Sequence, residues 1–240
     1  MTNHAMLNNV DHKDLRVDTR HGAELGDNVM SALALPSEFR NIVADYPIFF
    51  QRDNETGKYL PLAMFGFQHG ENLYLDGDQW NATYIPLMMQ RGPFMIGFQE
   101  VGGNGSASKK MVISIDMDDP RVGAADGEPL FQPFGDNSEY TDGIVEVLQE
   151  IEHGQAVIEG LIDALVEQDL LEPFSLDVEL NNGEKHRLHG FHTIHEEKLA
   201  ALDPALLADF NRRGILQACY MVIASMANIP RLIALKNKRL

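Results

Sequence analysis

A long amphipathic stripe is the clearest pattern of hydrophobic and polar positions in the chain. Its apolar residues recur at the 3.6-residue spacing of one helix face. They are Ile144, Val147, Leu148, Ile151, Ile158, Leu161, Ile162 and Leu165. Asn137 or Ser138 can cap the N-terminus, and the helix must end before Pro173. The pattern predicts one helix of about 30 residues, which at about 1.5 Å per residue is about 45 Å long.

Three pairs of strand-like segments flank turn sequences. With their turns they read YPIFFQ-RDNETG-KYLPLAMFGF (46–67), RGPFMIGFQ-EVGGNGSAS-KKMVISID (91–116) and FSLDVEL-NNG-EKHRLHGFHTI (174–194). Apolar residues that are rich in β-formers and bounded by Gly, Asn and Asp are typical of hairpins. We therefore predict three antiparallel hairpins, the second of them with a flexible tip. GENLYLDGDQW (70–80) predicts a further turn-rich pair.

The C-terminal third favours helices. Asp203 and Pro204 stand in the order of an N-cap and a first-turn proline, and Gly214 is placed to end that helix. An apolar helix follows, which we expect to be interrupted at Pro230.

These patterns predict an α+β fold. Residues 31–240 would form a single domain in which a mostly antiparallel sheet is covered by the long central helix and the C-terminal helices. Residues 117–137, dense in Pro, Gly and Asp, would wrap its surface. Residues 1–30 show no periodicity, so we expect a flexible N-terminal arm that is loose or packs on a partner.

Charge narrows the classes of partner. The 240 residues include 36 Asp and Glu against 19 Lys and Arg, a net charge of −17. This charge repels phosphates, so nucleic acids and anionic membrane surfaces are not expected partners. The apolar stretch 215–229 is shorter than a bilayer span, and the polar N-terminus does not have the pattern of a signal peptide. We expect a soluble, cytoplasmic protein without a membrane span, whose single Cys219 is a buried hydrophobe.

Four histidines, His186, His189, His192 and His195, recur at every third position of the last hairpin. In a regular strand, His186, Leu188, His192 and Ile194 would share one face, and Arg187, His189, Phe191 and His195 the other. Histidines on one face would then be about 20 Å apart, at about 3.3 Å per residue. A single metal ion cannot bridge that distance. If the strand ends near Thr193, however, His192, His195 and Glu196 could converge.

A second possible metal site begins at His69-Gly70-Glu71. Together with a distant histidine such as His192, His69 and Glu71 could form a site with two histidines and one carboxylate for iron or zinc. The alternative is a hairpin turn in which Gly70 provides the bend. Asp116, the first of three acids in DMDDP, either binds a divalent cation with its neighbours or belongs to a turn begun by Asp-Pro.

Several phrases, taken in order, resemble the SapC family of bacterial proteins. They are YPIFF (46–50), PLAMFGFQHGENLYLD (61–76), WNATYIP (80–86), RGPF (91–94), SIDMDDP (114–120), GEPLF (127–131), GFHTIHEEKLAAL (190–202) and ASMANIPRL (224–232). The family is named after surface-layer gene clusters, and its members are often described as peptide-transport proteins. The resemblance implies an accessory role in the uptake or modification of a substrate. It assigns no catalytic residue.

Our leading hypothesis is a non-catalytic accessory or binding protein for a peptide, protein or small ligand, without a cofactor. Glu71, Trp80, Arg91 and Asp116 lie near predicted strand ends and turns and supply recognition chemistry. The alternative is a metal-dependent enzyme, such as a non-haem iron oxygenase that uses His69, Glu71 and a distant histidine. A third possibility is a homo-oligomer joined through the N-terminal arm.

Overall fold

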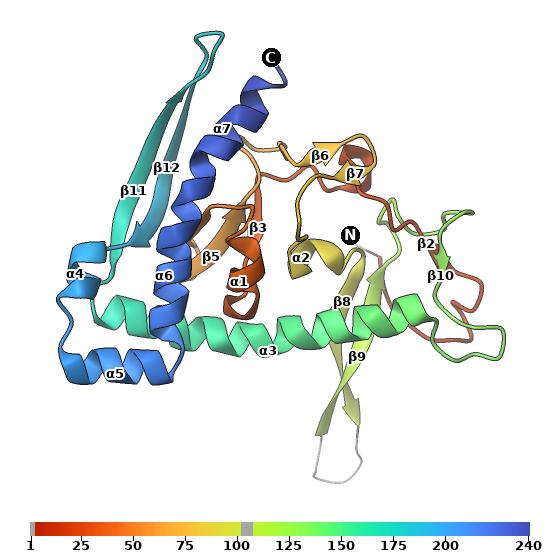
Figure 1. Ribbon diagram of the computed structural model, residues 1–240. Helices are drawn as coiled ribbons and strands as arrows, with labels where there is room; N and C mark the ends of the chain where they lie inside the picture. The colour runs from red at the N-terminus through yellow and green to blue at the C-terminus, as the bar shows by residue number, and fades with distance from the viewer. Residues whose placement is uncertain (1–2, 102–107) are drawn as a thin grey trace.

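The structure, a computed structural model, describes residues 3–101 and 108–240 (Figure 1). Its central sheet has five strands in the order β11-β12-β4-β5-β3, and every neighbouring pair is antiparallel. The central strands are β3 (Ser31–Leu33), β4 (Ile48–Arg52), β5 (Tyr59–Met64), β11 (Leu171–Glu179) and β12 (Lys185–Ile194). The predicted α+β fold with a mostly antiparallel sheet is confirmed.

Helix α3 (Glu139–Glu167) is the long helix that the apolar stripe predicts. Its N-cap is Ser138, whose hydroxyl oxygen accepts a hydrogen bond from the Thr141 N–H at 3.1 Å. Figure 1 shows α3 crossing the molecule along one side of the strands. Gly154 permits close packing here, because a Cβ at this position would lie 2.9 Å from Cδ1 of Leu35.

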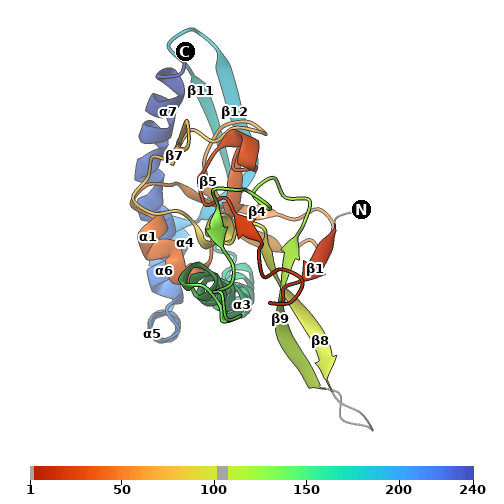
Figure 2. The same cartoon turned by 90° about the vertical axis from the view of Figure 1, so that its right-hand side faces the viewer.

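The second predicted hairpin is formed by β8 (Phe94–Val101) and β9 (Ser108–Asp116). It projects beyond α3, as Figure 2 shows. We predicted a flexible tip in the loop of residues 100–108, and residues 102–107 of that loop lie outside the described residues.

The N-terminal segment differs from the flexible arm that we predicted. Strand β1 (His4–Met6) pairs with β9, and β2 (Arg16–Val17) pairs with β10 (Glu128–Pro129). Val17 is fully buried. Strands of two or three residues are too short to show a periodicity, and their partners lie more than 100 residues away along the chain.

The C-terminal helices cover one side of the central sheet. They are α4 (Glu196–Ala200), α5 (Pro204–Arg212), α6 (Ile215–Ser225), the 3₁₀ turn η3 (Met226–Asn228) and α7 (Ile229–Asn237). Pro230 does not stop the helical course, because it lies in the first turn of α7, where proline is tolerated. In the described part of the chain, one helical run, Ile215–Asn237, is long and apolar enough to cross a bilayer, judged by length and composition alone. This run extends eight residues beyond the apolar stretch 215–229, which is by itself shorter than a bilayer span.

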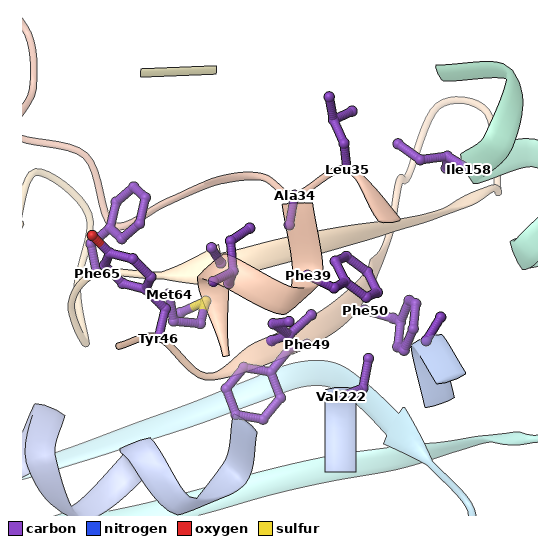
Figure 3. Close-up of a cluster of buried hydrophobic side chains, with 14 of the residues drawn as sticks. Ala34, Leu35, Phe39, Tyr46, Phe49, Phe50, Met64, Phe65, Ile158 and Val222 are labelled. Carbon is purple, nitrogen blue, oxygen red and sulfur yellow. The ribbon is translucent and has the colours of Figure 1, made fainter. Parts of the chain in front are cut away.

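A cluster of buried aromatic and aliphatic side chains joins the sheet to the helices (Figure 3). Phe50 of β4 and Val222 of α6 are fully buried in it, as is Phe39 of α1 (Phe39–Ile42). Each such side chain contributes roughly 1.5–3 kcal/mol when it is buried. The remaining short elements are η1 (Ala23–Leu25), η2 (Pro36–Glu38), β6 (Leu75–Asp76), β7 (Gln79–Trp80) and α2 (Leu87–Gln90).

Candidate functional site

Trp80, one of the four predicted recognition residues, belongs to the core. Its side chain is buried, and Nε1 donates a hydrogen bond to the Tyr46 hydroxyl oxygen at 2.7 Å. Its ring packs edge-on against Phe65, with 5.2 Å between the centroids. The polar atom of the indole is thus satisfied within the fold. Trp80 therefore positions the loops around β7.

Glu71 is also buried, and both of its carboxylate oxygens have partners. Oε2 accepts a hydrogen bond from the Phe67 N–H at 2.8 Å, and Oε1 forms an ion pair with Lys236 of α7. Both charged side chains are about one-tenth exposed. Glu71 therefore closes the loop of residues 66–71 and fastens it to the C-terminal helix.

Arg91 and Asp116 lie in separate places. Arg91 donates a hydrogen bond to the Phe94 carbonyl oxygen at 2.8 Å and lines a cavity of about 260 Å³ between α2, β8 and α3. Burial lowers the pKa of its guanidinium. Asp116 ends β9, where its carboxylate accepts a hydrogen bond from the Asp118 N–H at 3.1 Å and faces His4. The four predicted residues do not converge on one site.

The structure does not bring the alternative metal ligands together either. The carboxylate of Glu71 is occupied by protein partners, His69 is exposed, and His192 contacts the Tyr59 hydroxyl group at 3.4 Å. His195 caps α4 through its ring nitrogen. Within residues 3–101 and 108–240, no three His, Cys, Asp or Glu side chains form a group that could hold a metal ion.

A groove of about 530 Å³ lies beside β12, between that strand and the loop of residues 66–71. Its volume falls in the range typical of ligand sites, about 300–1,000 Å³. Its lining residues are Val29, Met30, Ser31, Gln51, Phe67, Gln68, His69, Gly70, Arg187, Leu188, His189 and Phe191. We call it the β12 groove, with a loop wall (residues 66–71) and a strand wall (residues 185–191).

The ionisable side chains in the described lining of the β12 groove are basic in type, although the whole protein is acidic. The net charge of the chain is −17, yet the ionisable residues in the described lining are His69, Arg187 and His189, with no Asp or Glu among them. Ser31 and Gln51 add neutral hydrogen-bonding groups. Such a lining favours a ligand with negative charge.

Comparison with known families gives one result. The family model described as SapC matches residues 7–232, nearly the whole chain. The chain belongs to the SapC family. The match includes both walls of the β12 groove and confirms the resemblance seen in the sequence. The comparisons with curated proteins and with solved structures give no match.

The strand wall of this SapC chain carries its cations in exposed cross-strand pairs. Nε of Arg187 lies 3.4 Å from Asp177, and the ammonium group of Lys185 lies 3.3 Å from Glu179. All four side chains are at least two-thirds exposed. Among the described residues, the terminal amino groups of Arg187 have no hydrogen-bond partner and can reach a ligand.

The predicted division of the histidines between two strand faces is wrong beyond residue 189. Phe174 pairs with Phe191, whereas Leu176 pairs with Leu188, so β12 carries one extra residue in a bulge. Gly190, with φ of +81°, adopts the backbone conformation that the bulge requires. Leu188 and Phe191 consequently share one face.

Sequence reasoning placed Arg187 and His189 on one strand face but did not select them as binding residues. The available signal was the occurrence of two basic-type side chains at alternate positions of a strand in an acidic chain. Glu71 was selected as a contact residue, whereas its geometry gives it a positioning role.

Proposed function

We propose that this SapC-family chain is a non-catalytic binding protein that holds an anionic ligand in the β12 groove. In this proposal it serves as an accessory in the uptake or modification of the molecule that carries that ligand. The observation that carries the proposal is the composition of the groove lining: in an acidic chain, its described ionisable residues are His69, Arg187 and His189, with no Asp or Glu.

Arg187 is the central recognition residue of the proposal. A guanidinium group donates hydrogen bonds to a carboxylate in a bidentate geometry, which gives both affinity and orientation. Its pair with Asp177 is exposed to water, and exposed pairs contribute only about 0.2–1 kcal/mol. An incoming carboxylate can therefore replace or share this partner at small cost.

Binding is favoured over catalysis by the surroundings of the two histidines. A catalytic histidine is normally hydrogen-bonded to a nucleophile or oriented by a carboxylate. In the part of the chain that the structure describes, neither His69 nor His189 has such a partner. Both are placed to donate a ring N–H hydrogen bond to a bound anion.

The test is an NMR titration of the protein with the peptide acetyl-Glu-Val-Glu-Val-Glu-amide and, separately, with its Gln-for-Glu analogue. We expect the acidic peptide to shift amide signals of residues 67–70 and 187–191, and the neutral analogue to bind at least tenfold more weakly. Arg187→Gln should reduce the affinity at least tenfold.

Lys58→Gln is the matched control. The Lys58 side chain is as exposed as that of Arg187 and also pairs with an acid, Glu159 of α3, but Lys58 does not line the groove. We expect this variant to bind within about threefold of the wild type. Equal affinities for the acidic and neutral peptides, or equal losses in both variants, would overturn the proposal.

A further inference from the structure

Within the described part of the chain, one edge of β12 has a strand partner over only a short part of its length. The strand pairs with β11 from Lys185 to Ile194, but with β4 only at Phe191 and His192. Beyond Arg52, strand β4 turns away, because the Asp53 N–H donates a hydrogen bond to the Lys58 carbonyl oxygen at 2.8 Å and closes the hairpin. Among the described residues, no strand occupies the edge of residues 185–190.

The hydrogen-bond pattern shows which backbone groups face that edge. The Leu180 N–H donates to the Glu184 carbonyl oxygen at 2.8 Å. In an antiparallel ladder, hydrogen-bonded pairs recur at every second position. The register therefore bonds His186 and Leu188 to β11, and it directs the N–H and C=O groups of Lys185 and Arg187 away from β11.

The β12 groove lies along the same edge. Its lining includes three consecutive residues of β12, Arg187, Leu188 and His189, although their side chains alternate in direction. A cavity that touches consecutive residues of a strand adjoins its backbone edge. Unpaired N–H and C=O groups at such an edge are a template for another extended chain.

We propose that the β12 groove binds an acidic peptide segment of a partner protein in an extended conformation, as an added strand on the edge of β12. This inference rests on the proposed function and specifies its ligand. The main-chain groups of Lys185 and Arg187 pair with the peptide backbone, and the guanidinium group of Arg187 contacts its carboxylates.

The alternating direction of side chains along a strand determines which peptide sequence fits this edge. Side chains of an added strand point to the two faces of the sheet in turn. The exposed face of β12 carries Lys185 and Arg187, whereas Leu188 is buried on the other face. The segment is therefore one in which acidic and apolar residues alternate.

The charge of β12 argues against a second copy of this strand as the occupant of the edge. Two copies of β12 placed edge to edge would bring the Lys185 and Arg187 side chains of both copies together, and like charges on neighbouring strands are destabilising. Lysine and arginine on an exposed edge discourage such self-pairing. They attract an acidic strand from another protein.

Backbone methylation of the same Glu/Val peptide tests the inference. One version is N-methylated at positions 2 and 4, and the other at positions 1, 3 and 5. Because N–H groups of a strand point alternately to its two edges, only one version loses the donors that face β12. We expect that version to bind at least tenfold more weakly than the unmethylated peptide and the other to remain within about threefold.

Amide hydrogen exchange provides a second readout on the protein itself. The amides of Lys185 and Arg187 should exchange at least tenfold more slowly when the peptide is bound. Those of His186 and Leu188, already bonded to β11, should change little and serve as internal controls.

The outcomes separate this inference from the proposed function. Equal binding of both methylated peptides, with the Gln analogue still weak, overturns strand addition and leaves anion binding intact. Equal binding of the Glu and Gln peptides overturns anion recognition. No binding of any peptide at millimolar concentration overturns both. A dimer in sedimentation experiments without peptide, which the acidic peptide dissociates by competition, would show that a second copy is the occupant.

Discussion

The two walls of the β12 groove are held by different kinds of interaction. The loop wall depends on one buried ion pair, between Glu71 and Lys236, whose side chains are 9% and 11% exposed. The strand wall carries the pairs of Lys185 and Arg187 with acids of β11, at two-thirds exposure or more. One wall is fastened to α7, and the other presents its cations to water.

This difference assigns different tasks to the two walls. Removing one partner of a buried pair leaves a desolvated charge, which costs about 3–5 kcal/mol. An exposed pair contributes about 0.2–1 kcal/mol and can be exchanged for a ligand. The loop wall is therefore a fixed support, whereas the strand wall supplies exchangeable binding groups.

The largest expected effect comes from breaking the buried pair. Lys236→Met should lower the free energy of unfolding by about 3–5 kcal/mol, because Glu71 is left buried without its counter-ion. The double variant Glu71→Gln/Lys236→Met should lose less than the single variant, since no charge stays buried. Urea denaturation measures both, and a loss below about 1 kcal/mol for Lys236→Met would contradict the support role.

The next largest effects on stability are expected from substitutions of two glycines, one in each wall. A Cβ on Gly66 would lie 2.6 Å from the carbonyl oxygen of Glu71, so Gly66→Ala forces the loop wall apart and should cost about 1–3 kcal/mol. Gly190, in the strand wall, has open space but a φ of +81°. Gly190→Ala should therefore cost about 1–2 kcal/mol through backbone strain alone.

Asparagine serves as the discriminating substitution. It tolerates the left-handed region, so Gly190→Asn should be more stable than Gly190→Ala. At Gly66 it should give no relief, because the conflict there is one of space. Thermal or urea denaturation of the Ala and Asn variants at Gly66 and Gly190 tests this difference. If Asn were more stable than Ala at both positions, the two glycines would not differ in the way we expect.

A smaller effect on the free energy of unfolding is expected from the protonation of His192 of β12 as pH falls. Burial, together with the nearby Arg52 cation, lowers the pKa of His192 from its ordinary value of 6.5. The folded state thus favours the neutral ring, and the unfolded chain binds the proton first as pH falls. This stabilising contribution is present above about pH 6.5 and is lost below it.

His192→Gln should remove that contribution. The loss in unfolding free energy between pH 7.5 and pH 5.5 should be smaller in the variant than in the wild type. Identical losses, measured by urea denaturation at the two pH values, would show that His192 does not carry the effect.

The smallest effect on stability is expected from the strand wall. Lys185→Gln and Arg187→Gln should each change the free energy of unfolding by less than about 0.5 kcal/mol, because both pairs are exposed. The Arg187→Gln variant should nevertheless bind the acidic peptide more weakly than the wild type does. A destabilisation above about 2 kcal/mol in either variant would mean that these pairs are structural.

Local patterns could be predicted from the sequence with few errors. The stripe that ends at Leu165 became α3, and Ser138 caps it, because a helix is specified by contacts three and four residues apart. The hairpins followed for a similar reason, since a short turn sets the pairing of the strands around it. The family resemblance, which rests on ordered local phrases, was confirmed.

Predictions of environment were less successful. Trp80 was expected at a site and lies in the core, because its hydrogen-bond partner, Tyr46, is 34 positions away. The N-terminal residues, expected to be flexible, pair with β9 and β10. The bulge at Gly190 altered which β12 residues share a face, although the strand itself was predicted.

The helix, the hairpins, the acidic charge and the family can all be recognised from neighbouring residues or from composition. The folded arrangement was needed to show that His69 and Arg187, 118 positions apart by their numbers, line one groove. It was also needed to show that Glu71 forms an ion pair with Lys236, 165 positions away. Burial and charge pairing depend on distances in space, which local periodicity does not encode.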